Sequence, residues 1–226
     1  GEDADFVVIG ENGANSVTLG HGDDYLGSSG FLSRIDMGAG DDTVYLQGGA
    51  GQIDLGKGDD TVTVEGDVTR IDAGKGDDHV EVFGDAHVVD LGAGDDELTL
   101  HGDVSYVFAG GGDDMVTLGS GGAVLLGDGD DTMVFGSAGN AGLGGEGDDV
   151  FIFDTATAGG NNEAHGGNGD DTLLIAFDAR DGLYNETVEA LEGWDGGDID
   201  LTHLGIEVAD VEKIAVTVNG GIDFIF

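Results

Sequence analysis

The sequence predicts an all-β fold: a right-handed parallel β-roll, or β-solenoid, with 18-residue coils and a C-terminal capping segment. Three observations predict it. A Gly-Asp-Asp tripeptide recurs at a nearly constant period, apolar residues alternate with period two after each tripeptide, and the 226 residues include 47 Gly but no Pro. A stacked parallel ladder uses every backbone N–H, which Pro would remove, whereas tight turns favour Gly. We therefore expect many short strands joined by tight turns.

The tripeptide sets the coil length. Its successive ends lie 18 residues apart, except for one step of 17 and a last step of 22. A period held over this length indicates a repeat architecture in which each unit stacks on its neighbours. The nine tripeptides end at Asp24, Asp42, Asp60, Asp78, Asp96, Asp114, Asp131, Asp149 and Asp171.

Each repeat predicts two strands. After the acidic turn, apolar residues such as Val62 and Val64 alternate with polar ones, which is typical of a strand with one buried face. A second apolar pair follows nine residues later, as Ile71 and Ala73 show, and predicts a returning strand. The two strands face each other across a thin apolar core that no single coil could bury alone.

The repeat divides the chain into three segments. Residues 1–19 form a degenerate N-terminal coil, residues 20–175 carry the β-roll repeats, and residues 176–226 form a C-terminal cap. Residues 154–165 break the period, which predicts a bulging loop. A solenoid needs caps because an exposed last rung invites edge-to-edge pairing.

The cap has elements of its own. Residues 186–194 predict a short helix, and residues 211–226 predict one or two strands around the Asn-Gly-Gly turn at 219–221.

The charge balance excludes several classes of function. The chain has 48 acidic side chains against 6 Lys plus Arg, a formal charge of −42, yet 39% of its residues are hydrophobic. A disordered acidic chain lacks so much apolar material, so we expect a folded protein whose carboxylates are held by cations. Nucleic acids and anionic membrane surfaces require basic patches, and no apolar run is long enough to span a bilayer.

The stacked turns predict a calcium site. Coiling places Asp60 between Asp42 and Asp78, where carboxylates about 5 Å apart repel by roughly 1 to 3 kcal/mol per pair. Calcium takes six to eight oxygen ligands and accepts the backbone carbonyls that Gly-rich turns expose. Magnesium prefers strict octahedral geometry, and zinc favours His or Cys, whereas the six His show no repeated ligand spacing.

Two segments carry a family resemblance. Residues 144–152 (Gly-Gly-Glu-Gly-Asp-Asp-Val-Phe-Ile) and 166–174 (Gly-Gly-Asn-Gly-Asp-Asp-Thr-Leu-Leu) resemble the nonapeptide Gly-Gly-x-Gly-x-Asp-x-apolar-x of the repeats-in-toxin (RTX) family. The other turns are similar, with the first Gly replaced, as at Leu55 and Ala73. The resemblance covers about residues 20–175 and implies a calcium-binding β-roll from the C-terminal region of a type I secreted protein.

The resemblance also implies the ligands. The second Asp of each pair, the nine residues given above, is the expected side-chain ligand, whereas the first Asp faces solvent or the outer sphere. Nine turns leave up to eight gaps, and because the 22-residue step before Asp171 departs from the period at the last gap, we expect about seven calcium ions in a row. The carbonyl ligands implied are those of Ala39, Gly40, Lys57, Gly58, Lys75, Gly76, Ala93, Gly94, Gly111, Gly112, Gly129 and Gly147.

The second turn of each coil departs from the commonest RTX pattern. Its Asp position holds Ser33, Gly51, Thr69, His87 and Ser105. Asp67, Asp85 and Asp103 lie nearby, where ordinary turn chemistry and a weaker metal site are both open. A further ladder, expected to face outward for solubility or for extra metal contact, consists of Asp36, Asp54, Asp72 and Asp90.

Two functional hypotheses follow. The first is a calcium-triggered folding and secretion module that stays unfolded in the cytosol and folds outside the cell. The C-terminal residues 222–226 (Ile-Asp-Phe-Ile-Phe) resemble type I export signals, the alternative being a capping strand. The partners implied are calcium ions and the type I secretion machinery. The second hypothesis is a calcium-stiffened structural, adhesive or surface-layer segment, also extracellular or at the cell surface.

Other functions are disfavoured. The carboxylates are spread along a rod instead of converging on one cleft, so we expect no enzyme and no catalytic residues. Ice binding would require a flat outward hydroxyl array. The variable turn position instead holds His21, Ala39, Lys57, Lys75, Ala93, Gly111, Asp128, Glu146 and Asn168.

Overall fold

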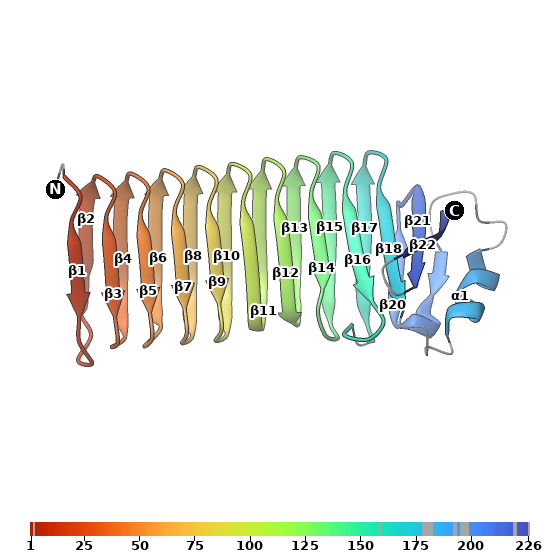
Figure 1. The fold of residues 1–226 in the computed structure, drawn as a ribbon, viewed down its shortest axis with the longest axis horizontal. Helices are drawn as coiled ribbons and strands as arrows, with labels where there is room; N and C mark the ends of the chain where they lie inside the picture. Colours follow the sequence, from red (N-terminus) through yellow and green to blue (C-terminus); the bar gives the residue numbers. More distant parts are fainter. Residues whose placement is uncertain are drawn as a thin grey trace.

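The stacked coils form a straight rod with the N-terminus at one end and a small cap at the other (Figure 1). The computed structural model describes residues 1, 3–158, 160–177, 183–191, 194, 199–218 and 221–225. Adjacent coils pair in parallel at an offset of one repeat, with Val62 opposite Val80 and Ile71 opposite Val89. The predicted parallel β-solenoid with coils of about 18 residues is confirmed.

Two parallel sheets run the length of the rod. The first sheet follows the Gly-Asp-Asp turns and consists of β1 (Phe6–Ile9), β3 (Tyr25–Ser28), β5 (Thr43–Leu46), β7 (Thr61–Val64), β9 (His79–Val82), β12 (Met115–Ser120), β14 (Thr132–Phe135), β16 (Val150–Asp154), β18 (Thr172–Phe177) and β21 (Lys213–Val218). The second sheet consists of β2 (Val17–His21), β4 (Leu32–Ala39), β6 (Ala50–Lys57), β8 (Val68–Lys75), β10 (Ala86–Ala93), β13 (Gly122–Asp128), β15 (Asn140–Glu146), β17 (Asn162–Asn168) and β20 (Ile206–Ala209). The long strand β11 (Glu97–Gly111) bends and contributes to both sheets.

The core lies between the sheets and is built as the alternation predicts. Val62, Val64, Ile71 and Ala73 are all fully buried, whereas the intervening Thr63 faces outward. Toward the C-terminus the core becomes aromatic, with the rings of Phe135 and Phe151 6.2 Å apart. Small residues on the facing sheet leave room for these rings: a Cβ at Gly142 would lie 2.9 Å from Cε1 of Phe151. Residue size is thus matched across the core.

The acidic turns are tight because Gly of one coil lies against the backbone of the coil before it. Gly94 has φ 136°, and a Cβ there would lie 2.1 Å from the carbonyl oxygen of Gly76. Gly111 occupies the variable position of the acidic turn in the next coil. A Cβ there would have open space, since its nearest neighbour would be the carbonyl oxygen of Asp128 at 3.8 Å. Only the first of these positions requires Gly.

This pair gives a matched prediction. We expect Gly94→Ala to destabilise the calcium-saturated fold by more than about 2 kcal/mol, because it combines backbone strain with a steric clash. Gly111→Ala is expected to change stability by less than about 1 kcal/mol. Thermal unfolding of the two variants in millimolar calcium tests this, and equal midpoints would contradict the turn geometry.

The 22-residue step is accommodated by a local loop. Turns at residues 155–158 follow β16, with the N–H groups of Thr157 and Ala158 donating to the carbonyl oxygen of Asp154 at 3.0 and 2.7 Å. The loop is shorter than predicted, because β17 already begins at Asn162, whose N–H donates to the carbonyl oxygen of Gly205 at 2.9 Å. Regular stacking then resumes.

Stacking continues into the cap although the sequence repeat has ended. β20 pairs with β17 and β21 pairs with β18, both in parallel. Each sheet then ends in an antiparallel strand, β19 (Ile199–Leu201) on β20 and β22 (Gly221–Ile225) on β21. These strands cover the last parallel edges, as a solenoid cap must.

Helices also belong to the cap. The predicted short helix is confirmed as α1 (Tyr184–Leu191), and the 3-10 turn η1 (Thr202–Leu204) precedes β20. Within the described residues, no helix is both long and apolar enough to cross a membrane.

Candidate metal centre

The nine predicted Asp ligands lie in one row along one edge of the rod. Each directly precedes a strand of the first sheet, and none is more than 2% exposed. Burial is unusual for a carboxylate and requires either a partner or neutralisation. The row consists of Asp24, Asp42, Asp60, Asp78, Asp96, Asp114, Asp131, Asp149 and Asp171.

One oxygen of each carboxylate is fixed by the neighbouring coil. The backbone N–H of Asp60 donates to Oδ1 of Asp78 at 2.8 Å, and the same contact recurs along the row at 2.7 to 3.0 Å. It persists across the 22-residue step, where the N–H of Asp149 donates to Oδ1 of Asp171 at 2.9 Å. The hydrogen-bond ladder is therefore continuous across this step, because the extra residues lie in the loop after β16.

The other carboxylate oxygen has no partner. Oδ2 of all nine Asp residues is buried without a hydrogen bond. A buried, unpaired carboxylate oxygen costs several kcal/mol unless a proton or a cation satisfies it. Among the described residues, nine such atoms in one row are therefore the clearest signature of a binding site.

Burial also changes the acidity of the row. Desolvation raises the pKa of Asp60, Asp96, Asp114 and Asp149 from 3.8 to about 7, although the backbone hydrogen bond from the neighbouring rung opposes it. The same cause raises the pKa of Asp42, Asp78 and Asp131 to about 6. Neighbouring carboxylates add to the increase. Without a cation, much of the row would carry protons near neutral pH.

A pH dependence of stability follows. The folded-state pKa values of about 6 to 7 lie above the ordinary value of 3.8, so protons favour the metal-free fold. This contribution is complete below the ordinary value and is lost as the pH rises through 6 to 7. We expect the metal-free chain to unfold at lower urea concentration at pH 8 than at pH 5, and saturating calcium to reverse that order. The same order with and without calcium would contradict this interpretation.

The predicted carbonyl ligands lie in the turns beside this row. The carbonyl oxygen of Lys75 accepts the N–H of Gly58 at 2.8 Å and keeps a second lone pair, whereas that of Gly76 points at Gly94 of the next coil. Among the described residues, no three His, Asp or Glu side chains gather as a metal site. A metal ion here would therefore take most of its ligands from the backbone, which suits calcium.

The two complete nonapeptides leave open space beside the carboxylate. A Cβ at Gly144 would lie 2.0 Å from Oδ2 of Asp149 and 2.2 Å from the carbonyl oxygen of Gly166. The two oxygens thus converge on space that only Gly leaves free. Two oxygens so placed fit the donor set of a hard cation such as calcium.

The first Asp of each pair faces solvent, as expected. Asp59 is exposed, and its N–H donates to Oδ1 of Asp41 at 3.0 Å. The outward ladder also faces solvent: Arg70 bridges Asp72 and Asp90 through Nη2 at 3.1 and 2.9 Å. These carboxylates are solvated or paired, unlike the buried row.

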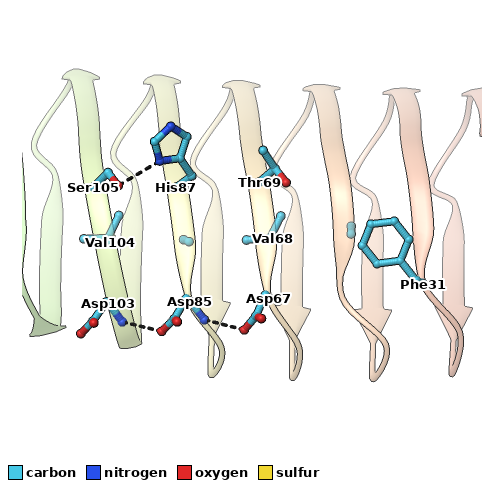
Figure 2. A pocket seen from close by; sticks show the side chains of 11 residues that line it. Phe31, Asp67, Val68, Thr69, Asp85, His87, Asp103, Val104 and Ser105 are labelled. Atoms are coloured by element: carbon cyan, nitrogen blue, oxygen red, sulfur yellow. Dashed lines mark hydrogen bonds between the residues drawn. The ribbon is translucent and has the colours of Figure 1, made fainter.

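The second edge of the coils is a shallow groove of about 410 Å³ (Figure 2). Asp67, Asp85 and Asp103 form one wall, where Oδ1 of Asp67 accepts the N–H of Asp85 and Oδ1 of Asp85 accepts the N–H of Asp103, both at 3.0 Å. His87 contacts Ser105 at 2.9 Å on the other wall. Because these Asp side chains are exposed and none has a buried oxygen without a partner, ordinary turn chemistry accounts for them.

Sequence reasoning missed the two exposed residues that extend the hydrogen-bond ladder beyond the ends of the buried row. The N–H of Asp5 donates to Oδ1 of Asp24 at 2.7 Å, so Asp5 occupies a rung position before the first tripeptide. Glu212 follows the last rung, and its Oε2 accepts the N–H of Asp171 at 2.9 Å. Neither residue lies in a Gly-Asp-Asp tripeptide. The available signal was their place directly before largely apolar strands, Phe6–Ile9 and Lys213–Val218.

The fold and this row define a class: a parallel β-solenoid with a one-sided ladder of buried acids. No family model matches the chain, and no curated protein matches it. Among solved structures, the chain is similar to a hyperactive, Ca²⁺-dependent, β-helical antifreeze protein from an Antarctic bacterium. The identity is 21%, the similarity covers 97% of this chain and 93% of the other, and the TM-score is 0.56. This likeness establishes the β-helical fold.

Proposed function

We propose that the chain is a calcium-binding β-roll that folds when calcium binds. The observation that carries this proposal is the row of nine buried Oδ2 atoms without partners. Calcium supplies the missing positive charge and accepts the adjacent backbone carbonyls. Nine rungs leave eight gaps, and because the row is unbroken, we propose eight ions between rungs instead of about seven. The ligands proposed are the nine Asp carboxylates and the turn carbonyls predicted from the sequence.

Calcium binding of this extent would decide whether the chain folds. One site stabilises the fold by about 2.7 kcal/mol when free calcium exceeds its Kd a hundredfold. Eight such sites contribute on the order of 20 kcal/mol, more than the whole stability of an ordinary domain. At low cytosolic calcium the acidic row would oppose coiling, and at millimolar extracellular calcium it would be neutralised.

This calcium dependence suits passage through a type I exporter. An unfolded chain can be threaded, and folding outside the cell would prevent its return. Support for the secretion role comes from the RTX-like nonapeptides and from the resemblance of residues 222–226 to an export signal, although residues 221–225 also pair with β21 as the capping strand β22. We accordingly place the chain outside the cell or at its surface.

A second function, as a calcium-stiffened adhesive or surface segment, is favoured by one observation. Tyr106, Phe108, Leu125 and Leu143 are 38 to 50% exposed on neighbouring strands of the second sheet, with Phe108 opposite Leu125 and Leu125 opposite Leu143. A contiguous apolar patch is typical of a contact surface. Export of a reporter fused to this chain by a type I transporter distinguishes the two functions, since a passive adhesive segment would not direct export.

We do not propose antifreeze activity for this chain. The outward turn positions of this chain carry Lys57, Lys75, Asp128 and Glu146 instead of a regular hydroxyl array. The shared property we propose is the calcium-dependent solenoid alone.

Equilibrium dialysis against radioactive calcium tests the proposal. We expect about eight ions per chain at pH 7.5, with little binding of magnesium because magnesium demands near-ideal octahedral geometry and gives up its waters reluctantly. Fewer than half that number of calcium ions, or equal binding of magnesium, would contradict it.

A further inference from the structure

The C-terminal end of the buried row contains a structure that the repeat does not encode. Asp171 is fully buried, and its Oδ2 has no hydrogen-bond partner. In every earlier gap the next coil contributes a Gly-Asp-Asp turn. Beyond Asp171 there is no such turn, so the last carboxylate must be completed by the cap.

Strand register shows which cap residues take the place of the turn. His165 pairs with Ala209, and Thr172 pairs with Lys213. Three residues, 210–212, therefore span the connection that takes six residues, 166–171, in the coil before. Asp210 adopts a left-handed conformation with φ 52°, which allows the sharp turn. Glu212 then occupies the register position of the next rung.

Glu212 reproduces the hydrogen bond of a rung with a longer side chain. Its Oε2 accepts the N–H of Asp171 at 2.9 Å, the contact that Oδ1 of Asp171 makes with Asp149 one coil earlier. The N–H groups of Glu212 and Lys213 both donate to the carbonyl oxygen of Asp171, at 3.1 and 3.0 Å. These contacts fix the carboxylate of Glu212 beside that of Asp171.

The oxygen atoms converge here as they do one coil earlier. A Cβ at Gly166 would lie 2.1 Å from the carbonyl oxygen of Asp210 and 2.2 Å from Oδ2 of Asp171. At Gly144, the corresponding distances to Gly166 and Asp149 are 2.2 and 2.0 Å. The carbonyl oxygen of Asp210 thus occupies the position that the carbonyl oxygen of Gly166 occupies one coil earlier, although the sequence around Asp210 does not resemble the repeat.

The solvent-facing row, formed by the first Asp of each pair, ends differently from the buried row. Lys213 Nζ lies 3.5 Å from Oδ2 of Asp170, so a side-chain cation terminates the solvent-facing carboxylates. Among the described residues, no Lys or Arg ion pair reaches Asp171 or Glu212. The buried carboxylate of Asp171 and the exposed carboxylate of Glu212 are thus left without a basic partner.

We propose that Asp171, Glu212 and the carbonyl oxygen of Asp210 form a terminal calcium site that fastens the cap to the roll. The proposal rests on calcium binding by the repeat row and adds a ninth ion, held by a non-repeat ligand. Its two carboxylates and one carbonyl are the hard oxygen donors that calcium takes. Cap docking would then depend on calcium as coil stacking does.

Glu212→Gln tests the site, because the amide oxygen still accepts the N–H of Asp171 while the charge is lost. Glu207→Gln is the matched control, since Glu207 is exposed on β20 of the same coil. Bound calcium is counted by native mass spectrometry, and fluorescence of Trp194, the single Trp and part of the cap, reports docking. We expect Glu212→Gln to bind one ion fewer and to raise the calcium midpoint of the Trp194 signal about tenfold.

The control is expected to match the wild type in both readouts. An unchanged ion count and midpoint in Glu212→Gln would overturn the terminal site while leaving the repeat row intact. If the wild type binds no calcium, the proposed function fails together with it. Should Glu212→Gln not fold, calcium anomalous scattering from wild-type crystals decides: a peak between Asp171 and Glu212 supports the site, and peaks confined to the repeat row overturn it.

Discussion

Removal of calcium at pH 7.5 is expected to abolish the β-sheet circular dichroism signal of this chain. Burial raises the pKa of Asp60 from 3.8 to about 7, and a shift of about three units costs the ionised fold roughly 4 kcal/mol. Burial also raises the pKa of most other Asp residues in the row. Because ordinary domains are stable by only about 5 to 15 kcal/mol, a few ionised rungs without cations outweigh the apolar core.

Far-UV circular dichroism during titration with a chelator measures this effect. We expect a cooperative loss of signal on chelation and full recovery on adding calcium, but no recovery with an equal concentration of magnesium. Strong chelation at pH 5 is the internal control, since protonation of the row should preserve part of the fold. A β signal that persists at pH 7.5 without calcium would show that folding does not require the ion.

Asp96→Asn is expected to have opposite effects on the two states of the chain. The amide oxygen still accepts the N–H of Asp78, which donates to Oδ1 of Asp96 at 2.7 Å, but the buried charge is gone. The metal-free fold should gain about 2 to 4 kcal/mol at pH 8, because burial raises the pKa of Asp96 to about 7. The calcium-saturated fold should lose a comparable amount, since a charged ligand of two adjacent gaps is missing.

Asp95→Asn provides the matched control. Asp95 belongs to the same turn but is exposed, so we expect less than about 1 kcal/mol in either state. Urea unfolding with calcium and with chelator measures all four differences. Destabilisation of both states by Asp96→Asn would mean that the carboxylate serves the hydrogen-bond ladder and has no cation to hold.

The sequence was sufficient for the repeating part of the fold. A strict period places Val62 over Val44 and Asp60 over Asp42, so one coil determines the environment of all the others. Burial of the second Asp and exposure of the first follow from alternation around the turn, because only one of two adjacent residues can face inward. For this reason the row of candidate ligands was predicted in full between Asp24 and Asp171.

The ends and interruptions could not be predicted in the same way. Whether the 22-residue step breaks the row depends on where in the coil the extra residues are inserted. The repeat period does not give that position. Glu212 replaces an Asp after a turn three residues shorter, a geometry that only the pairing of β20 with β17 and of β21 with β18 reveals. The exposed patch around Phe108 and Leu125 also depends on which alternate residues face outward across several coils.

Calcium anomalous diffraction from crystals grown in millimolar calcium tests the central claim most directly. The account predicts a line of peaks along the acidic edge, one per gap and about 4.8 Å apart, each beside an Oδ2 atom of the buried row. Acidic turns without any such peaks, in a chain that is nevertheless coiled as described, would contradict it.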